Sequence, residues 1–374
     1  MELAAARELF PIIHRQTFLN HAGIAPLSAP AAEALADFAR ECAEGAGAGY
    51  PRWQERLASA RRSAAALIGA APTEIAFTGN TSSGLSLIAE SFPWHPGDAV
   101  LVPVPDFPAN VYPWQHLARR GVAVHTVERR EGRLPPALIA AALRPEVRLL
   151  ALSSVDYATG FAADLPAIAA LCRERGVVLA VDAIQSLGVL PLDVKAAGVQ
   201  LLAAGGHKWL CGPLGSGLLY VAADLPVALT PPLVGWKSVV DPEDFHLHFE
   251  LRSDAARFEP GTPNYGGIFA LGKAIDLLRE VGAEAIRARV FGLVDLLAAG
   301  LKARGLTVTS SLAAGERSGI FCFEPPGDGA ACLRALAERQ VSVALRSGRI
   351  RLSPHFYNDE TDIARFFDAL DALI

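Results

Sequence analysis

Between residues 55 and 225, short continuous apolar runs alternate with segments in which apolar residues recur every three or four positions. Continuous apolar runs are typical of strands buried on both faces, and the longer period is typical of helices that cover a sheet. The predicted strands are IAFTG, AVLVPV, VAVHTV, RLLALSSV, VVLAVDA, LLAAGG and GLLYVAA. We therefore predict an α/β fold in which a mainly parallel, seven-stranded sheet lies between helices.

The remainder of the chain has a different pattern. Residues 225–267 are rich in Pro, Gly and aromatic residues and predict an irregular excursion over the large domain. A long helical stretch follows, then the strand candidates LTVTS, GIFCFE, VSVAL and RIRLS and a final helix. Helices followed by short strands predict a separate α+β domain. We assign the large domain to residues 16–264, and the small domain to residues 1–15 together with 265–374.

Composition and charge narrow the class of partner. The chain has 374 residues, of which 51% are hydrophobic and 20% charged, and its formal net charge is -5. Since no block of Lys and Arg occurs, we expect neither nucleic acid nor an anionic membrane as partner, but a small molecule. The N-terminal residues MELAAARELFPIIHRQ lack the apolar core of a signal peptide, so we expect a cytoplasmic protein.

The cysteines do not predict a metal centre or a disulfide framework. There are five, an odd number, and none forms a CxxC or Cys/His metal spacing. We interpret them as small buried hydrophobic residues. Cys211, three residues after Lys208, is the one with a modest case for a function.

Asp182 and Lys208 carry the chemistry that the sequence suggests. Asp182 ends the apolar run VVLAVDA, at the sheet edge where open α/β proteins bind their ligands. A buried carboxylate there needs a cation, either in a structural salt bridge or on a ligand. Lys208 follows one helix–strand step later, in GGHKWLCGPLGSG. Pyridoxal phosphate uses both residue types, because its aldehyde forms a Schiff base with lysine and its protonated ring nitrogen pairs with an acid.

A phosphate site is predicted where FTGNTSSGLSL passes from a strand into a helix. Helix N-termini favour anions, and Thr81 and Ser82 add hydroxyl donors. The alternative is an ordinary Ser/Thr helix cap.

Several motifs together resemble the class V aminotransferase family of fold-type I pyridoxal-phosphate enzymes. They are VDAIQSLG, HKWLCGPLGSGLLYV, DFPANVYPW, ARFEPGTPNYGG and RLSPHFYN. This family includes cysteine desulfurases, selenocysteine lyases, kynureninases and isopenicillin N epimerase. The resemblance implies the fold-type I fold, a pyridoxal 5'-phosphate cofactor, an amino-acid substrate, and a homodimer in which the neighbouring subunit completes each active site.

The resemblance also implies roles for cofactor-binding residues. Lys208 would form the Schiff base and move the α proton of the substrate. Asp182 would pair with the ring nitrogen, and Gln185 would bond the phenolic oxygen of the ring. The phosphate would be held by a set of polar residues and by a loop of the neighbouring subunit: Thr81, Ser82 and His207, with Gly261 and Thr262. For His207 a turn cap is the alternative, and for Gln185 a solvated position.

On the substrate side, Arg351 in RLSPHFYN would bind the α-carboxylate, a bidentate task that suits a guanidinium. Arg349 has the same strand parity and competes for this role, which would leave Arg351 on the surface. The segment NHAGIAP, with Asn20 and His21, resembles the family's substrate-side entrance, and a plain turn is the alternative.

Departures from the family pattern affect the expected reaction. Phe107 stands where cysteine desulfurases place a histidine over the cofactor, and a phenyl ring stacks but moves no proton. The segment LRSGRIRLSPHFYN lacks the nucleophilic cysteine of those enzymes. We therefore predict an aminotransferase or a C–S, C–Se or C–C lyase, and not an ordinary cysteine desulfurase. The alternatives are an amino-acid epimerase of the isopenicillin N epimerase type and a non-catalytic protein with this fold.

Phe107-Pro108 and SSVDYATG are closer to kynureninase, although Asp156 replaces the Asn of that family and GGHKW departs from its lysine motif. Asp156 is either an orienting residue for cofactor or substrate, or a strand-end cap.

Overall fold

The computed structural model describes residues 1–225 and 228–374. Pro226 and Val227, at the start of the predicted irregular segment, lie outside the described residues. A seven-stranded sheet forms the centre of the large domain, in the order β2-β8-β7-β6-β5-β3-β4. Its strands are β2 (Ile75–Thr78), β3 (Ala99–Val104), β4 (Ala123–Glu128), β5 (Val147–Ser153), β6 (Val178–Asp182), β7 (Leu201–Gly205) and β8 (Gly217–Val221). All neighbouring pairs are parallel except those of β8, so the α/β prediction is confirmed.

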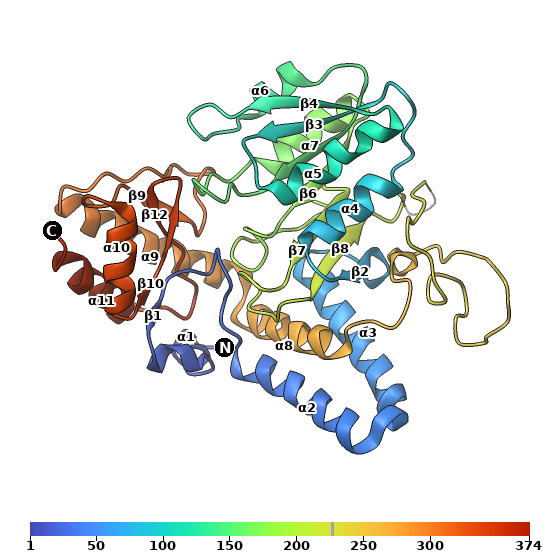
Figure 1. Cartoon of the computed structure of the whole chain (residues 1–374), viewed down its shortest axis with the longest axis horizontal. Helices are drawn as coiled ribbons and strands as arrows, with labels where there is room; N and C mark the ends of the chain where they lie inside the picture. The colour runs from blue at the N-terminus through green and yellow to red at the C-terminus, as the bar shows by residue number, and fades with distance from the viewer. Residues whose placement is uncertain (226–227) are drawn as a thin grey trace.

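Helices cover both faces of this sheet (Figure 1). One face packs against α4 (Thr81–Ser91) and α5 (Tyr112–Gln115), through a core that includes Leu85 and Trp114. The other face packs against α3 (Tyr50–Leu67), α6 (Pro136–Ala142), α7 (Leu165–Glu174) and α8 (Tyr265–Val281), and α2 (Ala29–Gly45) packs on α8. The packing of α8 places it with the large domain, although the predicted boundary at residue 264 assigns it to the small one. Burial on both faces explains why the central strands are apolar throughout.

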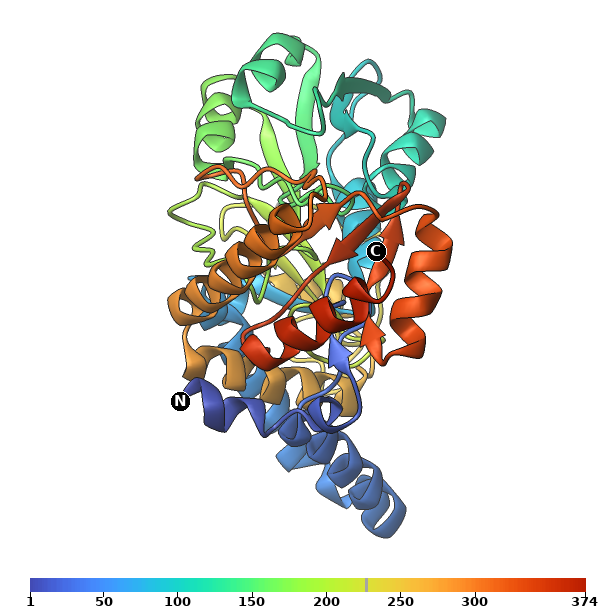
Figure 2. The same cartoon turned by 90° about the vertical axis from the view of Figure 1, so that its left-hand side faces the viewer.

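The C-terminal region builds the predicted α+β unit, visible in front in Figure 2. A three-stranded sheet of order β11-β12-β9 packs with the last helices. The C-terminal unit consists of α9 (Ala283–Ala303), β9 (Phe321–Phe323), α10 (Gly329–Glu338), β11 (Ala344–Arg346), β12 (Arg349–Leu352) and α11 (Glu360–Asp371). The long predicted helical stretch is interrupted at Gly282, whose φ of 94° ends α8. LTVTS forms one bridge, Val308 to Phe323, rather than a strand.

The N-terminal segment crosses to this C-terminal unit. After the short helix α1 (Leu3–Arg7), β1 (Thr17–Phe18) pairs with β10 (Val341–Ser342), and Asn20 forms a bridge with Ser353. The predicted boundary at residue 16 therefore places β1 in the large domain although its strand partner lies in the small one. The domain boundaries themselves stay predictions.

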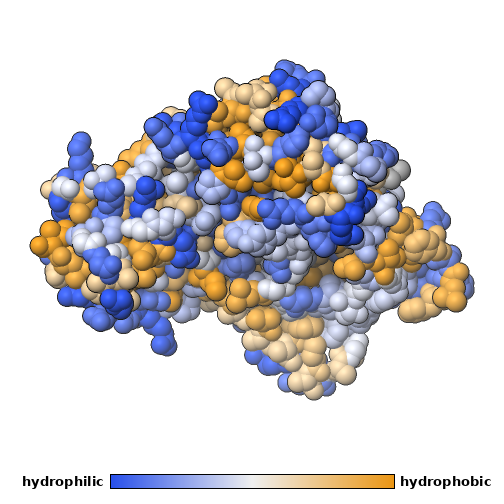
Figure 3. All heavy atoms as spheres, turned by 45° about the horizontal axis from the view of Figure 1, so that its top comes forward, coloured by the Kyte–Doolittle hydropathy of each residue, from blue (hydrophilic) through white to orange (hydrophobic). Residues whose placement is uncertain are grey.

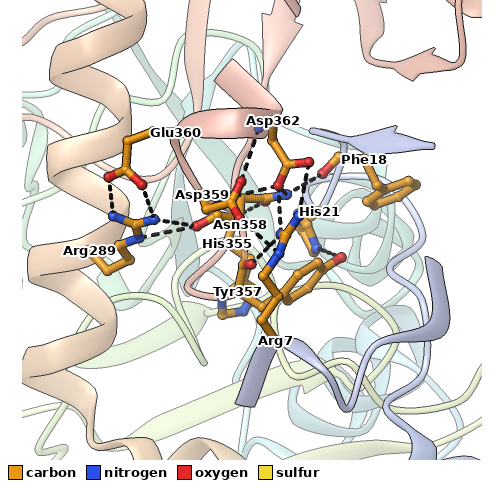
Figure 4. Close-up of polar contacts among 10 residues, drawn as sticks. All are labelled: Arg7, Phe18, His21, Arg289, His355, Tyr357, Asn358, Asp359, Glu360 and Asp362. Atoms are coloured by element: carbon orange, nitrogen blue, oxygen red, sulfur yellow. Dashed lines mark hydrogen bonds and ion pairs between the residues drawn. The ribbon is translucent and has the colours of Figure 1, made fainter. Parts of the chain in front are cut away.

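Polar side chains clamp the two ends of the chain together (Figure 4). Arg7 donates to Asp362 at 2.8 Å and to the carbonyl of Tyr357, and Asn358 donates to Asp362 at 3.0 Å. Arg289 forms an ion pair with Glu360 at 2.6 Å on the neighbouring helices α9 and α11. The N-terminal segment is thus held against the start of α11, close to the lysine turn.

In the described part of the chain, no helix combines the length and the apolar character needed to cross a membrane.

Candidate active site

Asp182 lies at the carboxyl end of β6, inside the protein. It is 2% exposed, and its Oδ1 accepts a hydrogen bond from the backbone N–H of Ile184 at 3.0 Å. Burial raises the pKa of Asp182 to about 7, a nearby Asp106 adds to this, and Lys208 opposes it. No salt bridge joins Asp182 to any cation that the structure describes, so the structural alternative is not the one observed.

Lys208 follows β7 and lies mostly out of solvent. Burial lowers its pKa to about 8, Asp182 opposes this, and Arg351 and Arg346 lower the pKa further. Its Nζ lies 5.6 Å from the centroid of the Phe107 ring and makes no hydrogen bond or ion pair with another described residue. A desolvated amine with a pKa near neutrality is the form in which lysine acts as a nucleophile.

The turn that carries Lys208 is held tightly from several sides. Gly188 has a φ of 103°, and a Cβ there would meet the carbonyl oxygen of Trp209 at 2.4 Å. Only glycine fits this approach without strain. The indole Nε1 of Trp209 donates to Gln185 Oε1 at 2.9 Å, and the carbonyl of His207 accepts from the N–H of Ala25 at 2.9 Å. The lysine therefore projects from a rigid support.

Gln185 is 3% exposed, so the solvated alternative is wrong. Besides its bond from Trp209, its Nε2 donates to the carbonyl of Ala22 at 3.2 Å. These bonds fix the side chain between the lysine turn and the N-terminal segment. A bond from the second Nε2 hydrogen to the cofactor's phenolic oxygen stays a prediction.

The start of α4 differs from an ordinary Ser/Thr cap. Asn80 is the capping residue, and its Oδ1 accepts from the N–H of Ser83 at 2.9 Å. Thr81 is buried, and its Oγ1 accepts from the N–H of Gly205 at 2.8 Å, which leaves its hydroxyl hydrogen free to donate. Ser82 is exposed and lines an open cavity of about 720 Å³. The capping task is filled by Asn80, so the hydroxyls remain candidates for phosphate.

His207 and the loop before α8 complete the predicted phosphate set. The pKa of His207 is lowered, first by burial and then by Lys208. Its ring makes no hydrogen bond with a described residue, so it does not cap the turn. Thr262 is exposed and Gly261 partly so. Their contact with a neighbouring subunit stays a prediction.

Arg351 lies in the interior, and the surface alternative is wrong. It is 1% exposed, and its Nη1 donates to the carbonyl of Tyr157 at 2.7 Å. Its Nε is buried without a hydrogen-bond partner among the described residues. Burial lowers its pKa to about 10. Arg349 has the same parity but is partly exposed, because it stands opposite Arg346 where the β11–β12 hairpin turns.

His21 has a different place from the one expected. It is 0% exposed, and its Nδ1 donates to the carbonyl of Ser353 at 2.8 Å. Its Nε2 accepts from the hydroxyl of Tyr357 at 2.7 Å (Figure 4). Both ring nitrogens thus serve the fold, and we correct the expected substrate contact to a role in positioning the segment. Asn20 remains a candidate substrate-binding residue, since its Oδ1 is buried and without a hydrogen-bond partner in the described part of the chain.

Sequence reasoning missed two charged residues next to the site. Asp106 follows β3 and donors surround it, and Arg129 follows β4 with a side chain that is 2% exposed. Asp106 follows an apolar strand just as Asp182 ends one, so the same rule could have found it. Nothing in the charged run VERREGR distinguishes Arg129.

A doubly wound sheet that brings a buried acid and a desolvated lysine to one edge defines an enzyme of the pyridoxal-phosphate fold type. The sequence matches the family described as Aminotransferase class-V over residues 24–366, and the chain belongs to this family.

Alignments with curated relatives cover almost the whole length of this chain and of the relatives. A probable cysteine desulfurase of Methanothermobacter thermautotrophicus is 28% identical, with 100% of this chain and 98% of that protein aligned. Isopenicillin N epimerase of Amycolatopsis lactamdurans is 30% identical, covering 99% and 98%.

Among solved structures, C-DES is similar in two forms. A lysine-to-alanine mutant with glycine covalently linked to the PLP cofactor has a TM-score of 0.91 and 26% identity, covering 98% of this chain and 99% of that one. The complex of the cystine C–S lyase C-DES with cysteine persulfide has a TM-score of 0.90 and 27% identity, covering 97% and 99%.

Buried neutral histidines predict an acid-sensitive fold. His355 donates from Nε2 to the carbonyl of Trp209 and accepts at Nδ1 from the N–H of Phe356, an arrangement that needs the neutral ring. Burial lowers its pKa to about 4, below the unfolded value of 6.5. Its stabilisation is therefore complete above pH 6.5 and is lost as the pH falls toward 4, by up to about 3 kcal/mol. Urea unfolding between pH 4 and 7 should show this decrease in the free energy of unfolding. A His355→Asn variant should show a smaller decrease. The same pH dependence in both proteins would contradict the role given to His355.

Proposed function

We propose that the chain binds pyridoxal phosphate at Lys208 and acts on an α-amino acid. The residues fit this group: Asp182 is a buried carboxylate without a salt bridge in the described structure, and Lys208 is an unpaired, desolvated amine beside it. When bound, pyridoxal phosphate supplies an aldehyde for a lysine and an electron-withdrawing ring. A mutant of C-DES, which shares the fold, has glycine covalently linked to this cofactor. The pair of Asp182 and Lys208 at one sheet edge is the observation that carries the proposal.

Each residue then has a physical task. Asp182 keeps a positive charge on the ring nitrogen, because a carboxylate in a low-dielectric site interacts strongly with a cation. Lys208, with its lowered pKa, takes and returns the α proton at Nζ. The Phe107 ring covers one face of the site without exchanging protons. Arg351 binds the α-carboxylate through its free Nε and the remaining guanidinium donors.

We infer a reaction that uses no protein thiol: transamination, or cleavage of a C–S, C–Se or C–C bond. Cys322 stands opposite Arg351 between β9 and β12, but it is 0% exposed and burial raises its pKa to about 11. Cys211 is 2% exposed, and burial raises its pKa as well. The thiolate is the nucleophilic form, so neither cysteine suits persulfide formation. The prediction that all five cysteines are buried is wrong for Cys42, which is exposed on α2. The relatives named cysteine desulfurase do not support the exclusion of a protein thiol, which therefore rests on the burial of Cys322 and Cys211 alone.

Epimerisation is the second candidate, because isopenicillin N epimerase is 30% identical over nearly the whole chain. It requires an acid/base on the substrate face opposite to Lys208. Phe107, the ring that faces Nζ, cannot serve. The chirality of recovered amino acid separates this reaction from the others.

We also propose a homodimer whose neighbouring subunit completes the site through Gly261 and Thr262. Residues 236–251 project from the molecule and carry exposed hydrophobic side chains (Figures 1 and 3). Phe245 is 75% exposed, Phe249 73%, and Leu247 fully. Apolar clusters of this kind mark interaction surfaces. Light scattering after gel filtration measures the molar mass in solution: twice the mass of the chain supports the dimer, and the mass of one chain contradicts it.

A cytoplasmic location of the protein stays a prediction.

The deciding experiment follows the visible absorption of the pyridoxal-phosphate-loaded protein while single amino acids are added without a keto acid. A band that is lost after one turnover and restored by a keto acid indicates an aminotransferase. A persistent band with accumulating keto acid, sulfide or alanine indicates a lyase, and a persistent band with inverted amino acid indicates an epimerase. No band after addition of pyridoxal phosphate would overturn the proposed function.

Arg351 and Arg349 form a matched pair for testing carboxylate binding. Arg351→Gln is expected to raise KM for the amino acid about 10- to 100-fold, the cost of a lost charge-assisted hydrogen bond. Arg349→Gln on the same strand is expected to change KM little, because that side chain is partly exposed. Steady-state kinetics of both variants check this; a larger effect at Arg349 would reverse the assignment.

A further inference from the structure

Arg129 is a buried cation just outside the residues assigned above. Its backbone N–H donates to the carbonyl of Val104 at 2.9 Å, which continues the pairing of β4 with β3. Its side chain is 2% exposed, and Nε donates to the carbonyl of Pro105 at 3.1 Å. The guanidinium is thus held where the loops after β3 and β5 meet.

Two carboxylates flank this guanidinium. Nη2 of Arg129 lies 3.7 Å from Oδ2 of Asp106, and Nε lies 3.5 Å from Oδ2 of Asp156. The two acid side chains are 0% and 4% exposed. Nη1 and Nη2 of Arg129 are buried and make no hydrogen bond with a described residue. Burial of charges costs several kcal/mol, and an apolar side chain would serve stability as well, so stability alone does not account for Arg129.

Asp106 connects Arg129 to the Phe107 side of the site. Its Oδ1 accepts from the N–H of Phe107 and from the hydroxyl of Ser153, both at 2.7 Å, and its Oδ2 accepts from Asn110 at 3.1 Å. Ser153 is the register partner of Asp182 across β5 and β6. Asp106 therefore fixes the position of Phe107 relative to the carboxyl end of β6, where Asp182 lies.

Asp156 connects Arg129 to the turn that contains Tyr157. Its Oδ1 accepts from the N–H groups of Ala158 and Thr159 at 3.0 and 2.7 Å, which shapes the turn that contains Tyr157. The carbonyl of Tyr157 accepts from Arg351, and its ring meets Phe107 edge-on at 5.3 Å. Asp156 therefore has the capping role that was one of its two predicted alternatives, and its role in orienting cofactor or substrate stays a prediction.

Charge gives Arg129 a second effect on the site. Three buried carboxylates, Asp106, Asp156 and Asp182, stand against three buried cations, Arg129, Lys208 and Arg351. Burial raises the pKa of Asp106, and the charge of Arg129 is the first effect that opposes this rise, ahead of hydrogen bonds from Ser153, Phe107 and Asn110. Loss of Arg129 would remove a positive charge from the site, which favours the protonated forms of the ionisable groups that remain.

We propose that Arg129 is a positioning residue of the active site, which binds Asp106 and Asp156 together and so sets Phe107 against Tyr157 and Arg351. The proposal rests on the pyridoxal-phosphate function proposed above. It concerns how the cofactor is seated, so it can be measured without turnover.

The test compares Arg129→Met, Arg129→Lys and Arg130→Met, the last being an exposed arginine of the same turn. Cofactor-stripped protein is titrated with pyridoxal phosphate, and the loaded protein is followed by induced circular dichroism and by the pH at which its visible band changes. Arg129→Met is expected to weaken binding at least about tenfold, to alter the dichroism and to move the band midpoint upward. Arg129→Lys should recover most of the affinity, and Arg130→Met should match the wild type.

A lower melting temperature of Arg129→Met, with wild-type affinity, dichroism and band midpoint, would overturn the proposal. If Arg129→Met does not fold, Asp156→Asn takes its place, because it keeps the acceptor for Ala158 and Thr159 but loses the ion pair. Altered dichroism in that variant supports the proposal, and unchanged dichroism overturns it. A wild-type protein that binds no pyridoxal phosphate would instead defeat the proposed function.

Discussion

Replacement of Lys208 by alanine is expected to lower kcat at least about 1,000-fold, because the variant loses both the amine that holds the cofactor and the group that moves the α proton. The fold should persist. The side chain makes no hydrogen bond or ion pair with another described residue, and burial disfavours its charge. Pyridoxal phosphate should still bind, without the covalent link, through Asp182 and the start of α4. Borohydride reduction followed by mass spectrometry checks the loss of the link.

Lys302→Ala is the matched control for this variant, since Lys302 is exposed on α9. It should keep full activity and the covalent link. Wild-type biological activity in Lys208→Ala would favour the alternative of a non-catalytic protein with this fold. Wild-type turnover with a covalent link at another lysine would show that the attachment site is wrong.

Asp182→Asn is expected to lower kcat about 100- to 1,000-fold with a smaller change in KM. Asparagine has nearly the same shape and can keep the bond from the N–H of Ile184, so the strand end should stay in place. What it loses is the negative charge that holds a positive ring nitrogen. Because the carboxylate is 2% exposed, water cannot replace this charge.

The measurement is single-turnover kinetics with the loaded enzyme, together with thermal unfolding of Asp182→Asn. A variant that unfolds near the wild-type temperature but reacts slowly supports the electrostatic role. Near-normal rates in a folded variant would mean that Asp182 is a structural acid. Glu41→Gln is a control that removes a carboxylate far along the chain, paired with Arg56 at 2.9 Å.

The positions of strand ends in the sequence predict that Asp182 and Lys208 lie close together. Asp182 ends an apolar run and Lys208 follows one helix–strand step later, and parallel strands bring such ends to one edge. The substrate contact of His21, which the resemblance of NHAGIAP to the family's entrance segment implied, was wrong, because both ring nitrogens bond to Ser353 and Tyr357, more than 300 residues away. Strand parity left Arg349 and Arg351 undecided, since both have the same parity on β12.

By itself, the sequence determined the α/β fold, the order of its strands along the chain and the family, and it predicted that Asp182 and Lys208 lie at one edge of the sheet. These follow from local periodicity and from motifs, which depend on neighbouring residues. The tertiary structure decided which arginine is buried, that His21 serves the fold, that Cys211 and Cys322 are buried while Cys42 is exposed, and that Arg129 joins Asp106 to Asp156. These outcomes depend on burial and on contacts between segments distant in sequence, and such long-range terms leave no periodic signal along the chain.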